Sequence, residues 1–419
     1  MSNLIKQRNP IAWLLDPVEP TADQADASYR FDWSPTAWLL PIGLGTAALV
    51  VSAVGWATEA QQFFFSYLVG WIFCVSLALG GLFFVLIQHL TQARWSVVVR
   101  RIPEALIWSF PVLAILGIPL LFGLHDLYHW THADLFDPAS PSYDSVIAAK
   151  ESYLNIPFFL GRAAFYFLLW STVSYKLYTL SIRQDVDGDP QIPALQRKTS
   201  AWGLALVSIT TAFSGFDFLM SLDPHWFSTI FGVYFFAGSF MAIMAFTALV
   251  AMILQKAGML QGTVTTEHYQ DLGKFLFGFV VFWAYIAFSQ YMLIWYANMP
   301  EETLFYRHRL ENGWETYSAV LLIAHFLIPF IVLISRSAKR FIPVLGFMCV
   351  WMLVMHWFDF FWLAMPVLHE HPSFHLLDLS TAVGLFGIVS GTVLYRLSRH
   401  SLVPEKDPNL GKSLAFTNS

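Results

Sequence analysis

Ten long apolar stretches limit what this chain can fold into. Each is long enough to cross a bilayer as a helix, because about 20 apolar residues at a rise of about 1.5 Å per residue span the hydrocarbon core. Transmembrane strands would instead alternate polar and apolar residues over segments of about ten residues. The sequence therefore predicts an all-α polytopic membrane protein. Its expected transmembrane helices are residues 36–56, 63–91, 103–124, 156–182, 200–222, 226–255, 272–296, 315–335, 341–363 and 377–396.

The composition agrees with this fold class. Of 419 residues, 57% are hydrophobic and only 12% are charged, and the mean hydropathy is +0.56. A soluble domain cannot carry such a composition on its surface. No basic, aromatic-rich patch indicates nucleic acid as a partner, so lipids and other membrane subunits are the expected surroundings.

Lys and Arg are distributed very unequally between the two sides. The N-terminal arm (1–35), every second connection and the C-terminal tail (397–419) hold nineteen of them, whereas the opposite side holds only Lys150, Arg307 and Arg309. Because short inner loops retain Lys and Arg, both termini are expected in the cytoplasm, with no cleavable signal peptide before the first span. Within the arm, Asn9–Leu15 predicts a short apolar turn that anchors at the membrane surface or docks on a partner.

An aspartate interrupts the fifth apolar stretch. Asp217 lies about 8 Å inside the outer end of its expected helix, where an exposed carboxylate would be costly. At helical spacing Thr210, Ser214, Asp217 and Ser221 share one face. We therefore expect this stripe to face protein or water instead of lipid.

The fourth stretch contains an arginine at a similar depth. Arg162 lies about 9 Å below the outer end of its helix, so it needs a partner or a water path. Its matched depth and opposite charge predict an ion pair with Asp217. The alternative is that Arg162 extends to the outer surface and leaves Asp217 to other partners.

The ninth stretch repeats the Phe-Asp-Phe pattern of the fifth. Phe358-Asp359-Phe360 lies near an outer end, as Phe216-Asp217-Phe218 does, and His356 lies one turn below. The two patterns are four helices apart. A parallel internal repeat of spans two to five and six to nine would place both aspartates in equivalent positions.

His325 is expected near the middle of the eighth span. It is either a neutral buried histidine bonded to a neighbouring helix or a member of a proton relay. Its predicted depth differs from that of His356 by several residues, which argues against a b-type haem held by facing histidines. A transporter or channel, the other alternative, would show Gly and Pro interruptions at the midplane, whereas the breaks here lie mainly near helix ends.

The outer side is rich in histidine. If residues 125–132 were helical, His125, His129 and His132 would share one face, which suits either a metal site or a polar surface for a partner. No fourth ligand accompanies them, so no metal site is predicted. We expect loops 125–155 and 366–376 to contact extracytoplasmic subunits. The two cysteines, Cys74 and Cys349, both lie within spans and form no Cys-x-x-Cys motif, so iron–sulfur clusters and c-type haem are not expected on this chain.

Three segments resemble the large membrane subunits of bacterial alternative complex III, a quinol:electron-acceptor oxidoreductase. They are FDFLMSLDPHWFSTIFGVYFFAGS (216–239), WFDFFWLAMP (357–366), and the helix from Arg162 to Tyr175 with the following Ser181–Asp185. The resemblance covers essentially the whole chain. These subunits belong to the polysulfide-reductase membrane-anchor (NrfD-like) superfamily. The length of this chain is similar to that of the F subunit, whereas the quinol-binding C subunit is longer.

The resemblance implies ten helices in two four-helix bundles, about 63–222 and 226–363, with a flanking pair. It also implies a bacterial cytoplasmic membrane location, with haems and clusters in a multihaem cytochrome c and an iron–sulfur subunit, a homologous C-type partner, and menaquinol or another quinol as the substrate. We expect an anchoring subunit without catalytic residues of its own that lines a proton path. The candidate residues of that path are Arg162, Asp217, His325, His356, Asp359, Thr210, Ser214 and Ser221.

Overall fold

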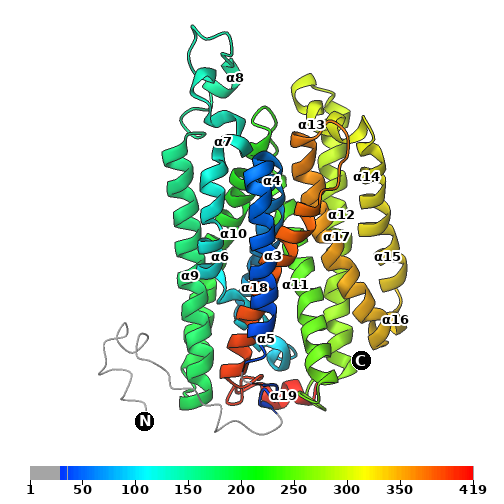
Figure 1. Ribbon diagram of the computed structural model, residues 1–419. Helices are drawn as coiled ribbons and strands as arrows, with labels where there is room; N and C mark the ends of the chain where they lie inside the picture. Colours follow the sequence, from blue (N-terminus) through cyan, green and yellow to red (C-terminus); the bar gives the residue numbers. More distant parts are fainter. Residues whose placement is uncertain (1–28, 35, 419) are drawn as a thin grey trace.

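All regular structure in the described residues, 29–34 and 36–418 of a computed structural model, is helical (Figure 1). Within this part of the chain, ten helical spans are long and apolar enough to cross a membrane. The predicted all-α architecture and number of spans are therefore confirmed. The spans are Leu39–Thr58 (α3), Ala60–Thr91 (α4), Val97–Leu127 (α5 to α7), Ile156–Asp187 (α9), Ile192–Leu222 (α10 and η5), Phe231–Lys256 (α11), Thr266–Ala297 (α12), Trp314–Leu333 (α14 to α15), Ile342–Leu368 (α17) and Leu376–Arg399 (α18).

Three of these spans are composed of more than one helical segment. The fifth contains α10 (Ile192–Phe218) and η5 (Met220–Leu222). Proline at the start of several segments explains part of this division, because a proline has no N–H for the preceding turn. The third span contains α5 (Val97–Ile107), α6 (Phe110–Leu116), η2 (Ile118–Gly123) and α7 (Leu124–Leu127). The eighth contains α14 (Trp314–Val320), the π-helix η6 (Leu321–Leu327) and α15 (Ile328–Leu333), with α13 (Pro300–Leu310) before it and α16 (Arg336–Arg340) after it.

The sixth span begins later than the apolar pattern indicates. The expected start was residue 226, whereas α11 begins at Phe231. Trp226 belongs to the preceding turn, where its backbone N–H bonds to the Asp223 carbonyl at 3.1 Å. Its indole stacks on Phe305 of α13 with 3.9 Å between ring centroids. Trp226 is thus an apolar residue that packs in a loop, although its place in an apolar stretch predicts that it belongs to the helix.

Helix α4 forms the centre of the molecule. It packs against α5, α10, α11, α17 and α18, and nearly all of its side chains are buried. Gly80 permits the closest of these approaches, because a Cβ at that position would lie 2.1 Å from the carbonyl oxygen of Ser239 on α11. Small residues allow such contacts between transmembrane helices.

Helices α3 and α18 pack against each other beside α4. Glycines line their contact: a Cβ on Gly45 would lie 2.6 Å from the Gly384 carbonyl oxygen, and one on Gly391 would lie 2.3 Å from the side chain of Ile42. The other side of α3 carries exposed apolar residues such as Leu40 and Val54. This exposed apolar surface suits contact with lipid.

The two ends of the described chain meet at one face of the molecule. The backbone N–H of Leu402 bonds to the Tyr29 carbonyl at 2.9 Å, and α19 (Leu410–Leu414) lies at the same face (Figure 1). We call it the terminal face and the opposite one the far face. The apolar turn predicted at Asn9–Leu15 lies outside the described residues.

Candidate functional site

Arg162 of α9 and Asp217 of α10 form the ion pair that the sequence predicts. The Arg162 Nε donates to Asp217 Oδ2 at 2.9 Å and its second terminal nitrogen donates to Oδ1 at 2.8 Å. Tyr166 and Tyr153 add hydroxyl donors at 2.7 and 3.0 Å. Asp217 is only 1% exposed. Both carboxylate oxygens are therefore fully occupied, and the buried charge is compensated.

The hydroxyl stripe below Asp217 is buried, as predicted, but it does not form a continuous chain. Thr210 accepts from the Trp170 indole at 3.0 Å and donates to its own helix at Leu206. Ser214 donates to the Thr211 carbonyl at 2.8 Å, and Ser221 donates to the Asp217 carbonyl at 2.5 Å. These bonds hold the hydroxyls on their own helix, and a proton path along them stays a prediction.

A second buried polar group surrounds Asp359 on α17. Tyr234 of α11 donates its hydroxyl to Asp359 Oδ1, and Trp283 of α12 donates its indole N–H to Oδ2 at 3.1 Å. His325 and His356 lie close enough that one ligand atom from each and a carboxylate oxygen of Asp359 are all within 4.8 Å of one another. We call Tyr234, Trp283, His325, His356 and Asp359 the Asp359 cluster.

The two histidines lie at similar depths because α17 continues to Leu368, beyond the expected end of the ninth span at 363. His325 is 11 residues from the start of α14 at Trp314 (325 − 314), and His356 is 12 residues from Leu368 (368 − 356). Pro329 has no N–H to bond the carbonyl of His325 four residues earlier, and a π-turn at Leu321–Leu327 accommodates this. The expectation that His325 and His356 differ in depth was wrong, because it ended the ninth span too early.

Packing then fixes both imidazoles. The His325 ring lies against the Trp283 ring, tilted by 33°, with 3.8 Å between centroids. The His356 Nε2 bonds to Ser76 of α4 at 2.9 Å, and its ring fills the space left by Gly238, where a Cβ would lie 2.7 Å from Cε1. Among the described residues, neither ring nitrogen of His325 nor Nδ1 of His356 has a hydrogen-bond partner. These three nitrogens are buried and carry no hydrogen bond that a proton would have to displace.

An apolar cavity of about 550 Å³ adjoins the Asp359 cluster. Tyr234 and Trp283 belong to both, so the same two side chains bond Asp359 and line the cavity. Phe288 and Leu322 also line it and are 60% and 57% exposed on the surface of the spans. Because exposed apolar residues of a span face lipid, the cavity adjoins the membrane interior. Other lining residues are Tyr291, Tyr306, Phe326, Trp362, Gln290 and Glu315.

The two Phe-Asp-Phe patterns therefore have different surroundings. An arginine compensates Asp217, whereas no Lys or Arg of the described chain forms an ion pair with Asp359. A cavity and two histidines lie near Asp359 instead. A carboxylate without a cationic partner is the better candidate for proton exchange in an apolar medium.

The donor set of the Asp359 cluster also bears on metal binding. Two histidines and a carboxylate are a combination that transition metals use. Here Tyr234 and Trp283 already occupy both oxygens of Asp359, and Ser76 occupies one nitrogen of His356. These bonds leave a lone pair on each oxygen of Asp359, and Nδ1 of His356 has no partner. The same donor set therefore suits a transition metal as well as proton exchange, with Tyr234, Trp283 and Ser76 as outer hydrogen-bond partners of the ligands.

On the far face, residues 125–132 do not form the single helix that the sequence analysis considers. Helix α7 ends at Leu127, Tyr128 is extended, and His129–Thr131 form a short 3-10 turn. His132 nevertheless lies close to both other histidines, with ring centroids 5.5 Å from His125 and 5.7 Å from His129. His125 bonds Thr131 at 3.0 Å. Because residues 125–132 are not one helix, His125, His129 and His132 do not share a helical face.

Nearby, loop 125–155 is tied to the turn that precedes α11. Asp144 bonds His225 at 2.6 Å, and Lys150 donates to the Pro224 carbonyl at 2.6 Å. Partial burial raises the pKa of Asp144, but hydrogen bonds from His225 and from the N–H groups of Ile147 and Val146 outweigh this and hold the pKa below its usual value. The loop is therefore held on the far face by charged contacts.

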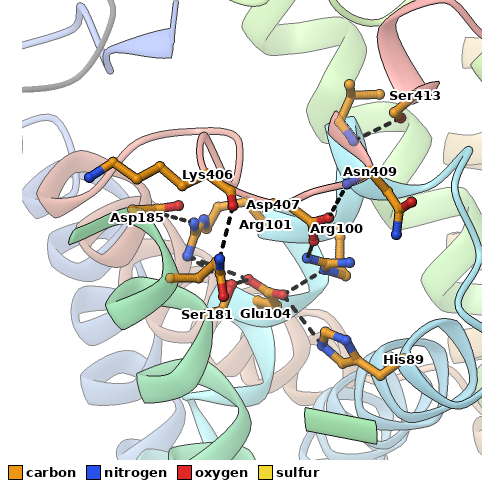
Figure 2. Close-up of polar contacts among 12 residues, drawn as sticks. His89, Arg100, Arg101, Glu104, Ser181, Asp185, Lys406, Asp407, Asn409 and Ser413 are labelled. Atoms are coloured by element: carbon orange, nitrogen blue, oxygen red, sulfur yellow. Dashed lines mark hydrogen bonds and ion pairs between the residues drawn. The ribbon is translucent and has the colours of Figure 1, made fainter. Parts of the chain in front are cut away.

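Two buried carboxylates were missed by the sequence analysis. Glu104 of α5 bonds Arg100 at 2.9 Å and Ser181 at 2.6 Å (Figure 2). Asp378 of α18 accepts from Ser66 at 2.5 Å and Gln62 at 3.1 Å. Arg100 and Arg101 lie four and three residues before Glu104, and this spacing indicates ion pairs with Glu104 within one helix. It was missed because those arginines were counted as loop charges.

Comparisons with known proteins give no further assignment. No protein-family model matches the sequence, and no curated protein matches it.

Proposed function

We propose that this chain is an integral membrane subunit of a quinol:electron-acceptor oxidoreductase of the alternative complex III type. It anchors the complex, binds a quinol in the cavity beside Trp283, and accepts protons from it at the Asp359 cluster. The observation that carries the proposal is the sharing of Tyr234 and Trp283 between the cavity and Asp359. An apolar ring ligand and a proton acceptor would thus be separated by single side chains.

The chemistry of a quinol requires this combination. Its oxidation releases two electrons and two protons, and the protons need acceptors at the site where the ring binds. Asp359, His325 and His356 supply a carboxylate and free imidazole nitrogens within one buried group. Apolar and aromatic walls with few polar groups are typical of a site for such a ligand.

The electrons would leave through partner subunits. With Cys74 and Cys349 as its cysteines, both buried in spans, the chain offers no thiolate set for a cluster. We assign haems to a multihaem cytochrome c subunit and clusters to an iron–sulfur subunit, which would dock on the far face through loops 125–155 and 366–376. A homologous C-type membrane subunit would lie beside this chain.

The finer architecture within this proposal is the one that the resemblance implies. Helices α4 to α7, α9 and α10 would form one bundle, and α11, α12, α14 to α15 and α17 the second. The close packing of α3 on α18 supports these two as the flanking pair. The excess of Lys and Arg in the terminal-face loops supports a cytoplasmic terminal face in a bacterial membrane.

A second candidate role differs only in where the quinol binds. The resemblance assigns the quinol to the C-type partner, and this chain would then line a proton path alone. The cavity beside Asp359 favours binding by this chain itself, as in a C-type subunit.

Quinone retention tests the proposal. Leu322→Trp should fill the lipid-facing side of the cavity and reduce the quinone extracted from the purified complex. Leu379→Trp is the matched control, because Leu379 is similarly exposed, at 50%, on α18 and does not line the cavity. Equal quinone content in both variants and in the unmodified complex would refute binding at this cavity.

A further inference from the structure

The apolar cavity beside Asp359 has a second polar end that the proposed proton transfer does not use. Tyr234 and Trp283 line the first end, where both bond Asp359. Gln290 and Tyr306 line the second. Gln290 lies seven residues after Trp283 on α12 (290 − 283), which is about two helical turns closer to the far face. We call the part of the cavity that Gln290 and Tyr306 line the Tyr306 end.

Hydrogen bonds decide which atom Tyr306 can offer to a ligand. Ser228, in the turn before α11, donates its hydroxyl to Gln290 Oε1 at 3.1 Å. The other amide atom of Gln290, Nε2, donates to the hydroxyl oxygen of Tyr306 at 3.1 Å. Among the described residues, the Tyr306 hydroxyl has no acceptor for its own proton. A phenol that already accepts one hydrogen bond is left with its O–H to donate, so Tyr306 offers a donor to the cavity.

The packing of α13 holds Tyr306 in this position. Its neighbour Phe305 is buried and stacks on Trp226 with 3.9 Å between ring centroids. One turn further along α13, Arg309 is also buried and donates to the Leu363 carbonyl of α17 at 2.6 Å. The helix is therefore fixed on both sides of Tyr306. A donor that is already in place loses little conformational freedom when a ligand binds.

The charge near Tyr306 also favours a ligand oxygen at this end. Burial lowers the pKa of Arg309 to about 10, although the charge of Asp223 opposes this shift, so Arg309 keeps its proton at neutral pH. Burial raises the pKa of Tyr306 to about 12, although the hydrogen bond from Gln290 and the charge of Arg309 oppose the rise. Tyr306 therefore stays a donor. A buried cation behind it favours the partial negative charge of an oxygen, because screening is weak in an apolar site.

We propose that Tyr306 determines the ligand class of the cavity by donating a hydrogen bond to the second oxygen of a quinol whose first oxygen faces Tyr234 and Asp359. The inference rests on the proposed function, because it takes this cavity to be the quinol site. A ring with oxygens on opposite carbons has one oxygen for each polar end. A ring with a single oxygen, or with two oxygens on neighbouring carbons, would leave one polar end unpaired.

A cycle that changes the protein and the ligand together tests this contact. The probes are naphthohydroquinone, which carries oxygens on opposite carbons of one ring, and the naphthol that lacks one of them. Their equilibrium binding to the full chain in detergent is measured under anaerobic conditions. The unmodified chain should bind the probe with two oxygens about three- to tenfold more tightly, the worth of one hydrogen bond. In Tyr306→Phe the two probes should bind equally, because only the Asp359 end can still bond an oxygen. An unchanged preference in Tyr306→Phe would overturn the inference.

Two further variants separate this inference from the proposed function. Tyr296→Phe removes the same hydroxyl from a residue of α12 that is 83% exposed and does not line the cavity, and it should keep the preference. Leu322→Trp should weaken the binding of both probes, because it fills the cavity. If both probes bind Leu322→Trp as tightly as the unmodified chain, the proposed function fails and the inference fails with it. If Leu322→Trp weakens both probes while Tyr306→Phe keeps the preference, the cavity is the site and only the role of Tyr306 is refuted.

Discussion

Trp283 joins the two halves of the proposed quinol site, because its indole N–H bonds Asp359 at 3.1 Å while its ring lies against that of His325 with 3.8 Å between centroids. The same side chain lines the apolar cavity. A ligand in that cavity would therefore contact the group that orients both Asp359 and His325. Asp359 therefore differs from Asp217 in its surroundings, because the partners of Asp217 are an arginine and two tyrosines.

The Arg162–Asp217 pair should be structural. Arg162→Gln or Asp217→Asn alone leaves a buried charge without its partner, at a cost of about 3 to 5 kcal/mol. The double variant should lose less than the sum of the two single losses. Melting temperatures of the purified complex measure this coupling. Additive losses, or single variants that keep full stability and turnover, would show that the pair does not hold the helices together.

The π-helix should be required for the position of His325. Pro329→Ala supplies an N–H that can bond the His325 carbonyl, so η6 should become a regular α-helix and turn His325 away from the cluster. A displacement of about 1 Å in such a site can reduce turnover about 100-fold. Quinol oxidation and melting temperature should be compared with those of Pro343→Ala, because Pro343 lies in the first turn of α17. Unchanged turnover in Pro329→Ala would contradict this role for the proline.

His400, which follows α18, should make stability depend on pH. Burial and the charges of Arg101, Arg396 and Arg399 lower the pKa of His400 to about 3. An unfolded histidine titrates near 6.5, so the unfolded state binds more protons between pH 6.5 and 3, and stability falls as the pH decreases through this window. His400→Gln should flatten that dependence, measured as melting temperature from pH 7 to 4. An unchanged slope would show that His400 has the same pKa in the folded and unfolded states.

The sequence predicts the ten spans and the Arg162–Asp217 pair for simple physical reasons. Long apolar runs require helices in a bilayer, and two opposite charges at one depth are costly to leave apart. Neither inference needs the exact path of the chain. The stripe of Thr210, Ser214 and Ser221 was likewise placed on the protein side by helical periodicity alone.

The Asp359 cluster could not be assembled in the same way. The apolar run of the ninth span was ended at 363, whereas α17 continues through Pro366 to Leu368 and places His356 at the depth of His325. The π-turn of the eighth span has only Pro329 as its sign in the sequence. The cavity depends on side chains from α11, α12, η6 and α17, whose packing no local pattern specifies. The ion pairs of Arg100 with Glu104 and Asp407 were missed for another reason, because Arg100 is buried although it appears in a loop-like basic sequence.

The central claim is that Asp359 accepts protons from a quinol bound beside it, and Asp359→Asn tests it most directly. The amide keeps the shape of the side chain, with its oxygen accepting from Trp283 and its nitrogen donating to the Tyr234 hydroxyl. It removes the proton acceptor, whose contribution in such sites is about 100- to 10,000-fold. Quinol oxidation by the purified complex in detergent should be measured with proton release in reconstituted vesicles. The account predicts that both fall in the same proportion. Normal quinol oxidation in detergent, with proton translocation alone reduced in vesicles, would contradict it and assign Asp359 to a proton path separate from the quinol.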